Sequence, residues 1–212
     1  MEATFQAIYD AVVAGNRETT QQLAREAVDA GHAANDILQQ GLIPAMGRVG
    51  DLFEAGQYFV PEMLIAARAM KGGLEVLRPL LGASGVAPMA KVALGTVQGD
   101  LHDIGKNLVS LMLEGAGFEV LDLGVDQSPQ AFVQAVDDGV RLVGMSALLT
   151  TTMPNMVTTL QALQNAGLRR KVKVMVGGAP VTQKWAQEIG ADGYAPDAAS
   201  AVRLAKKLLA IE

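Results

Sequence analysis

The first 81 residues place their hydrophobic side chains at the three- and four-residue spacing of amphipathic helices. Breaks at Gly15, Gly31 and Gly56 divide this stretch into four segments, and Pro61 suits the first turn of the last segment. Pro44 lies inside the third segment and predicts a kink there. Four helices joined by short turns predict a small helical bundle.

From residue 89 onward, short β-rich runs alternate with helical stretches. The predicted strands are Lys91–Val97, Glu119–Leu123, Leu142–Ser146, Val172–Val176 and a weaker Gly193–Ala195. The predicted helices are Ile104–Ala116, Pro129–Asp138, Pro154–Ala166, Val181–Ile189 and Ala198–Leu209. This alternation predicts a parallel sheet with helices on both faces, and the simplest strand order is the flavodoxin-like 2-1-3-4-5.

Between these halves, residues 82–88 read GASGVAP, which is the composition of a flexible linker. We therefore predict two domains. Residues 1–84 form a four-helix bundle, and residues 85–212 form a doubly wound α/β domain with a five-stranded parallel sheet.

Composition excludes several function classes. Half of the 212 residues are hydrophobic and 18% are charged, as in globular proteins. The net charge of -5 argues against nucleic acid as a partner, and the absence of cysteine excludes disulfides and thiolate metal sites. The first residues do not resemble a secretory signal, and no run approaches the length of a membrane span. We expect a cytoplasmic protein that does not contact membranes.

The predicted sheet also indicates where a ligand would bind. Open parallel sheets bind ligands beyond the carboxyl ends of their strands, at the point where the strand order reverses. Three polar or glycine-rich segments follow strands one, three and four, at residues 99–107, 146–154 and 177–180. They are expected to converge on one edge.

The first of these segments, GDLHDIGKN, holds the most informative pair, Asp100 and His102. A carboxylate that accepts from one imidazole nitrogen leaves the other free for a metal. Asp103 suits a helix cap, and Gly105 allows the close approach of a bulky group. A zinc centre needs three or four ligands, so this pair fits one axial ligand of a metal held by a macrocycle. By spacing alone, a capped loop with a solvated histidine remains the commoner arrangement.

The other two segments are ambiguous when they are taken singly. The hydroxyls of Ser146 and Thr150–Thr152 suit either a ligand's polar tail, a contact with Asp100, or ordinary helix caps. Gly177 and Gly178 suit either a plain turn or a place where a flat ring passes the backbone.

Together these segments resemble the cobalamin-binding domain family, whose signature is D-x-H-x-x-G, then S-x-L, then G-G. Here the signature reads Asp100–Gly105, Ser146–Leu148 and Gly177-Gly178. Residues 49–56, 59–64 and 66–70 resemble the helical cap that precedes this domain in methionine synthase and in methyltransferase corrinoid proteins. The run from Ser146 to Met153 is similar to that of the free-standing corrinoid proteins of anaerobic methyltransferase systems.

The resemblance implies a cobalamin or related corrinoid bound base-off, with His102 as the lower ligand to cobalt. It also implies that Asp100 accepts a hydrogen bond from His102 and that Thr152 completes the relay, where methionine synthase has a serine. The residues that it implies as cofactor contacts are Gly99, Asp100, Leu101, His102, Asp103, Ile104, Gly105, Ser146, Leu148, Thr150, Gly177, Gly178 and Ala198, with Phe53 and Val60 from the cap.

The same resemblance implies a function in one-carbon metabolism. The chain would accept a methyl group from a substrate:corrinoid methyltransferase of the methylamine, methanol, betaine or aryl methyl ether type, as methyl-Co(III). It would deliver the group to a corrinoid:tetrahydrofolate or corrinoid:thiol methyltransferase. A reductive activase would be a further partner. It would act as a carrier subunit and not as a stand-alone catalyst. The alternatives are the cobalamin subunit of a mutase, a cobalamin-dependent sensor, or a flavodoxin-like flavin or signalling domain.

Overall fold

The computed structural model describes residues 2–83 and 88–211. Its Cα positions separate into two compact units, one comprising Met1–Pro88 with Gly115–Gly117 and the other Met89–Glu114 with Phe118–Glu212. The predicted boundary between residues 84 and 85 lies outside the described residues. No helix in the described ranges combines the length and the apolar character that a membrane span requires.

The first unit is helical, as its hydrophobic spacing predicts. Its elements are α1 (Ala3–Val13), α2 (Arg17–Asp29), α3 (Ala34–Ile37), the π-helical turn η1 (Leu38–Leu42), α4 (Ile43–Glu54) and α5 (Val60–Ala83). Proline has no N–H to donate to the preceding turn, and the chain widens into η1 just before Pro44. The predicted kink in the third helix is therefore a π-helical turn between two α-helical pieces.

Close backbone approach holds this unit together where α5 packs on α2. A Cβ at Gly72 would meet Arg17 Cγ of α2 at 2.8 Å, and one at Gly73 would meet Thr20 Cγ2 of α2 at 3.2 Å and Leu42 Cδ2 of η1 at 2.8 Å. Arg17 also forms a 2.8 Å ion pair with Glu75, one turn beyond these glycines. The glycines let the two helices approach closely, so larger side chains there would push them apart.

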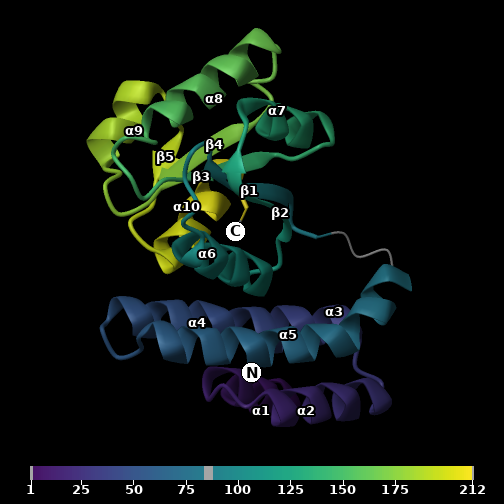
Figure 1. Ribbon diagram of the computed structural model, residues 1–212. Coiled ribbons are helices and arrows are strands. Elements are labelled where there is room, and N and C mark those ends of the chain that lie inside the picture. Colours follow the sequence, from purple (N-terminus) through teal and green to yellow (C-terminus); the bar gives the residue numbers. More distant parts are fainter. Residues whose placement is uncertain (1, 84–87, 212) are drawn as a thin grey trace. The chain divides into compact units, whose positions relative to one another are not determined.

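The second unit is an α/β domain. Its strands are β1 (Lys91–Val97), β2 (Glu119–Gln127), β3 (Leu142–Ser146), β4 (Lys173–Gly177) and β5 (Gly193–Tyr194). Its helices are α6 (Ile104–Gly115), α7 (Pro129–Asp137), α8 (Pro154–Asn165), α9 (Gln183–Ile189) and α10 (Ala198–Leu209). All strand pairs are parallel in the order β2-β1-β3-β4-β5, which confirms the predicted fold (Figure 1).

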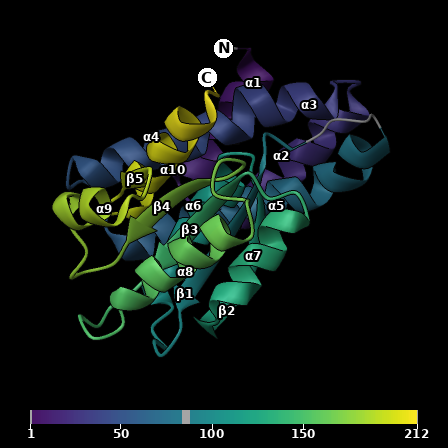
Figure 2. The same cartoon turned by 90° about the horizontal axis from the view of Figure 1, so that it is seen from above.

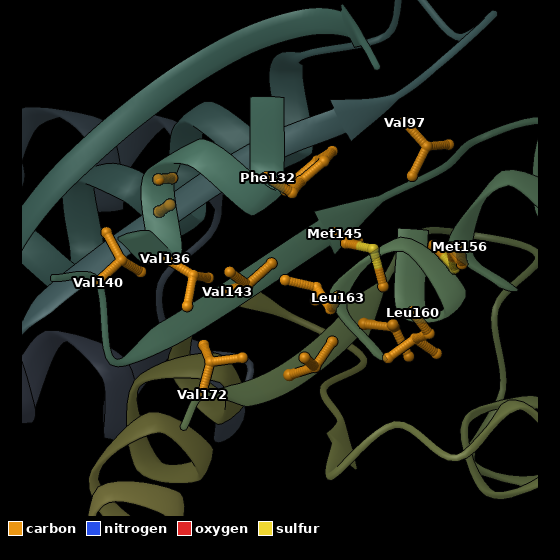
Figure 3. Packing of buried hydrophobic residues seen from close by; sticks show 14 of the residues in the cluster. Val97, Phe132, Val136, Val140, Val143, Met145, Met156, Leu160, Leu163 and Val172 are labelled. Atoms are coloured by element: carbon orange, nitrogen blue, oxygen red, sulfur yellow. The ribbon is translucent and has the colours of Figure 1, made fainter. Parts of the chain in front are cut away.

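Helices cover both faces of this sheet. Figures 1 and 2 show α7 and α8 on one face and α6 and α10 on the other. The first face holds a large hydrophobic cluster to which α7, α8 and α9 all contribute. In Figure 3, side chains from α7, β3 and α8, such as Phe132, Val143 and Leu160, point toward one another. Gly95 makes room for the ring, because a Cβ there would meet Phe132 Cζ at 2.7 Å.

The largest departure from the sequence prediction is the length of β2. The strand continues to Gln127, whereas the sequence prediction ends it at Leu123. Gly124 has φ +89° and Asp126 has φ +53°, and the register against β1 shifts on both sides of Gly95. The strand thus continues through an irregularity that moves its last residues toward the loop after β1.

Candidate functional site

The site lies where two loops leave the sheet at its switch point. The β1–α6 loop and the β3–α8 loop follow neighbouring strands, because β1 pairs with β3 on one side and with β2 on the other. Parallel strands end at the same edge, so both loops emerge together. The sequence prediction placed its candidate ligand edge at this point.

Asp100 is the centre of the site. Its side chain is fully buried, and its two oxygens accept five hydrogen bonds. Oδ1 accepts from the backbone N–H of His102 at 3.1 Å and pairs with His102 Nδ1 at 2.8 Å. Oδ2 accepts from the N–H groups of Leu148 at 2.8 Å and Leu149 at 3.2 Å and from Thr152 Oγ1 at 2.7 Å. This one carboxylate therefore ties the two loops together.

The hydrogen bonds decide the charge of Asp100. Its burial alone would raise the pKa, but the donors from Thr152, from the backbone and ring of His102 and from Leu148 outweigh that effect. They hold the pKa of the Asp100 carboxyl well below its usual range. The group is therefore an ionised acceptor at neutral pH.

The charge of Asp100 in turn decides the state of the His102 ring. An ionised carboxylate can only accept, so Nδ1 must carry the proton in the 2.8 Å contact. In the neutral ring, Nε2 then keeps its lone pair, which is the form that binds a metal. The His102 side chain is 52% exposed, so the ring is accessible from outside the protein.

Further contacts fix the loop that carries His102. Thr96, a buried residue of β1, donates its hydroxyl proton to the His102 carbonyl at 2.9 Å. Asp103 stands immediately before α6, and its carboxylate accepts from the Asn107 side chain at 3.0 Å. Gly99 adopts φ +81°, which favours glycine at this turn.

A buried lysine anchors the start of α6. Lys106 donates to Asp122 Oδ1 of β2 at 2.6 Å and to Asn107 Oδ1 at 2.7 Å. Burial of Asp122 would raise its pKa, but the bonds from Lys106 and from the Gly124 N–H lower it. The sequence prediction missed this pair, since a lysine near a helix start reads as solvated in a linear pattern.

The remaining predicted site residues of the α/β unit are spread around these loops. Ser146 ends β3, Thr150 is exposed in the loop that follows, and Ala198 is buried in the first turn of α10. Phe53 in α4 and Val60 at the start of α5 belong to the helical unit. The geometry brings together Asp100, His102 and Thr152.

Steric crowding by the protein's own backbone explains why glycine occupies positions 177 and 178. A Cβ at Gly178 would meet the carbonyl oxygen of Ala147 at 1.9 Å, and the φ of Gly178 is +126°. A Cβ at Gly177 would meet the Ala195 carbonyl oxygen at 3.1 Å. The protein's own backbone therefore requires glycine at position 178 and leaves little room at 177, whether or not a ligand passes there.

Large apolar side chains are exposed on the β1–α6 loop that carries His102, at the first residue of α6 and on the β3–α8 loop. Leu101 and Ile104 flank the histidine, and Leu148 and Leu149 belong to the loop that binds Asp100. Gly105 has open space where a Cβ would stand. Exposed apolar groups beside one polar ligand atom are typical of a surface that receives a large, mostly apolar molecule.

The donor set fits a corrinoid better than a bare metal ion. Among the described residues, no group of three or more His, Asp or Glu side chains could hold a metal. A single oriented imidazole instead suits a metal that arrives with its own macrocycle.

Comparison with known proteins also supports a corrinoid as the ligand. Two family models, both described as a B12 binding domain, match this chain over residues 90–203 and over residues 4–78. A dimethylamine corrinoid protein from Methanosarcina barkeri is 43% identical over 212 residues, which covers 99% of each chain. Dimethylamine corrinoid protein 1 of Methanosarcina acetivorans is 48% identical over 178 residues, covering 83% of this chain and 84% of that protein.

A solved structure shares the architecture. A chain of the methanol:cobalamin methyltransferase complex MtaBC from Methanosarcina barkeri matches with a TM-score of 0.86 at 29% identity. The match covers 99% of this chain and 80% of that chain.

Proposed function

Because this chain belongs to the corrinoid proteins of methyltransferase systems, whose B12 binding domain it carries, we propose that it binds a corrinoid at the His102 edge of its sheet and carries methyl groups between partner proteins. The observation that carries this proposal is the 2.8 Å contact between His102 Nδ1 and the buried, ionised Asp100. It leaves Nε2 as the metal-binding atom.

A bound corrinoid would supply a cobalt ion that can take up and release a methyl group. The protein's part is to hold and orient. His102 would hold the cobalt through Nε2, and Asp100 with Thr152 would keep the imidazole in the tautomer that leaves this nitrogen free. The exposed Leu101, Ile104 and Leu148 would provide an apolar surface against which the corrin ring packs.

The predicted contacts of the nucleotide tail and the cap belong to the same proposal. Ser146, Thr150, Gly177, Gly178 and Ala198 are proposed to line the slot for the tail. Phe53 and Val60 are proposed to cover the upper face and exclude water between transfers. Support comes from the match of the helical residues 4–78 to a B12 binding domain model.

The names of the relatives support part of the proposed set of partners. Relatives named as dimethylamine corrinoid proteins and a match within a methanol:cobalamin methyltransferase complex support a substrate:corrinoid methyltransferase as the first partner. A second methyltransferase that takes the methyl group and a reductive activase complete the proposed system. The cytoplasm remains the proposed location.

The first test is ligation of the metal by His102. Purified protein is loaded with cobinamide, a corrinoid without a nitrogen base of its own, and the Co(II) form is examined by electron paramagnetic resonance. A nitrogen ligand splits each cobalt line into three, because ¹⁴N has spin one. We expect this splitting in the unaltered protein and its loss in His102→Ala, with the fold retained.

The chain offers a matched control, because it has two histidines. His32 lies in the helical unit, where its ring contacts Phe5 at 5.2 Å between ring centroids. His32→Ala should leave the nitrogen splitting unchanged. An unaltered protein that takes up corrinoid without nitrogen splitting would contradict the assigned ligand.

A further inference from the structure

Asp126, near the end of β2, contacts the turn that carries Asp100 through both its backbone and its side chain. Asp126 Oδ1 accepts from the Gly99 N–H at 2.7 Å. The Asp126 N–H donates to the Asp100 carbonyl at 3.0 Å. Two bonds in opposite directions thus fix the peptide units on both sides of the Gly99–Asp100 link.

The backbone of Asp126 is unusual for a residue with a side chain. Its φ is +53°, and among the described residues only one other non-glycine residue, Ala210 at the end of α10, has a positive φ. Left-handed backbone is unfavourable for residues with a Cβ, although aspartate tolerates it better than most. Such conformations persist where the surroundings hold them, and they are frequent at functional sites.

The irregular end of β2 explains how Asp126 reaches this turn. Gly124 also has a positive φ, and the pairing with β1 shifts from Gly95↔Gly124 to Val97↔Gln127. A regular strand would keep its alternation of faces, whereas the extra residue redirects the following side chain. The carboxylate of Asp126 is thereby brought to the Gly99 amide.

We propose that Asp126 is a positioning residue for the His102 ligand. It fixes the Gly99–Asp100 turn, and through that turn it sets the direction of the Asp100 carboxylate and the orientation of the His102 ring before any corrinoid binds. The proposal rests on His102 being the lower ligand. Asp126 itself need not touch the corrinoid.

Two substitutions separate the contributions of Asp126. Asp126→Gly accepts the positive φ and keeps the backbone N–H, but it removes the oxygen that binds the Gly99 amide. Asp126→Asn keeps an acceptor oxygen and also tolerates the left-handed backbone. The control is Asp138→Gly at the end of α7, which removes an exposed carboxylate that accepts one hydrogen bond from Gln134.

The first readout uses the protein without corrinoid. Long-range ¹⁵N–¹H spectra of the imidazoles report which ring nitrogen of His102 carries the proton, and His32 serves as an internal reference. In Asp126→Gly we expect a second His102 tautomer to appear and the Gly99 amide to exchange about two- to tenfold faster, as the loss of one hydrogen bond implies. Asp126→Asn and Asp138→Gly should match the unaltered protein.

The second readout is the nitrogen splitting of the corrinoid-loaded Co(II) form. We expect a smaller fraction of nitrogen-ligated cobalt in Asp126→Gly and full ligation in Asp126→Asn. If the unaltered protein itself lacks the splitting, the assignment of His102 fails, and the tautomer data still decide the role of Asp126. If Asp126→Gly loses stability but keeps the His102 tautomer and full ligation, Asp126 only supports the strand and the proposal is overturned.

Discussion

At the residue scale, the opposing effects of burial and hydrogen bonding on Asp100 lead to a specific prediction about stability. Five hydrogen bonds converge on this buried carboxylate and lower its pKa against the effect of burial. Asp100→Asn would turn an amide NH₂ toward the N–H and O–H donors. At pH 7 we expect the substitution to lower the free energy of unfolding by about 1–3 kcal/mol, the cost of unsatisfied buried groups.

The sign of the pH dependence follows from the direction of the pKa shift. A carboxyl whose folded pKa lies below its unfolded value stabilises the fold fully above the unfolded pKa, near 4 for aspartate, and this stabilisation is lost as the pH falls below that value. The stability difference between the unaltered protein and Asp100→Asn should therefore narrow from pH 6 to pH 3. Urea unfolding followed by the fluorescence of Trp185, the single tryptophan, measures it in the α/β unit. If the free energies of unfolding of the two proteins kept a constant difference over this pH range, the charge of Asp100 would contribute nothing to stability.

At the element scale, the Lys106–Asp122 pair joins α6 to the edge strand β2. The two side chains differ in exposure, with 3% of the Lys106 side chain and 45% of the Asp122 side chain accessible to water. The consequences of removing one partner should differ accordingly, because a charge left behind in the interior costs far more than one that water can reach.

We predict that Asp122→Ala destabilises the α/β unit more than Lys106→Met does. The first change leaves a buried ammonium group with Asn107 as a neutral partner, for which about 3–5 kcal/mol is typical. The second leaves a carboxylate that is already half in water, so its cost should be smaller. Urea unfolding of both variants and of the double variant, followed by Trp185 fluorescence, gives the comparison. Equal losses would contradict the argument that the buried ammonium group left by Asp122→Ala costs more than the exposed carboxylate left by Lys106→Met.

The elements also show what the sequence could predict. The strand order and the bounds of β1, β3 and α10 agree with the prediction, because glycine, proline and polar residues mark where those β-rich and helical runs end. The extension of β2 beyond Gly124 was missed, since glycine usually ends a strand and the compensating positive φ at Asp126 has no linear signal. The same reason hid the contact of Asp126 with Gly99, which joins residues 27 positions apart.

The residues of the candidate site also divide into those that the sequence indicated and those that only the structure shows. Asp100 and His102 were singled out because they share one loop at a strand end, and Thr152 because the resemblance implies a hydroxyl there; the structure joins the three by hydrogen bonds. Spacing alone favoured a capped loop. Thr96, Lys106 and Asp126 were not found, because each acts on a segment that only the folded sheet brings near. Residues that support a ligand loop from neighbouring strands are therefore visible only in the structure.

At the scale of the whole molecule, both units match a B12 binding domain model, which raises the question of whether both respond to the cofactor. A ligand that binds only the folded state stabilises whatever it touches, by about 2.7 kcal/mol at a free concentration one hundred times its dissociation constant. For a chain of this length, that amounts to about 5–10 °C in the unfolding midpoint.

If Phe53 and Val60 cover the corrinoid, loading should protect the helical unit as well as the α/β unit. We predict slower amide exchange in α4 and α5 peptides of the loaded protein, together with a higher midpoint for the transition that Trp185 reports. Phe53→Ala should abolish most of the protection in α4 and α5 while leaving the Trp185 midpoint of the loaded protein nearly unchanged. The control is Ile65→Ala, which removes a side chain that is 47% exposed on α5 and should keep the protection. Protection confined to the α/β unit in the unaltered protein would remove Phe53 and Val60 from the site and leave His102 as its tested part.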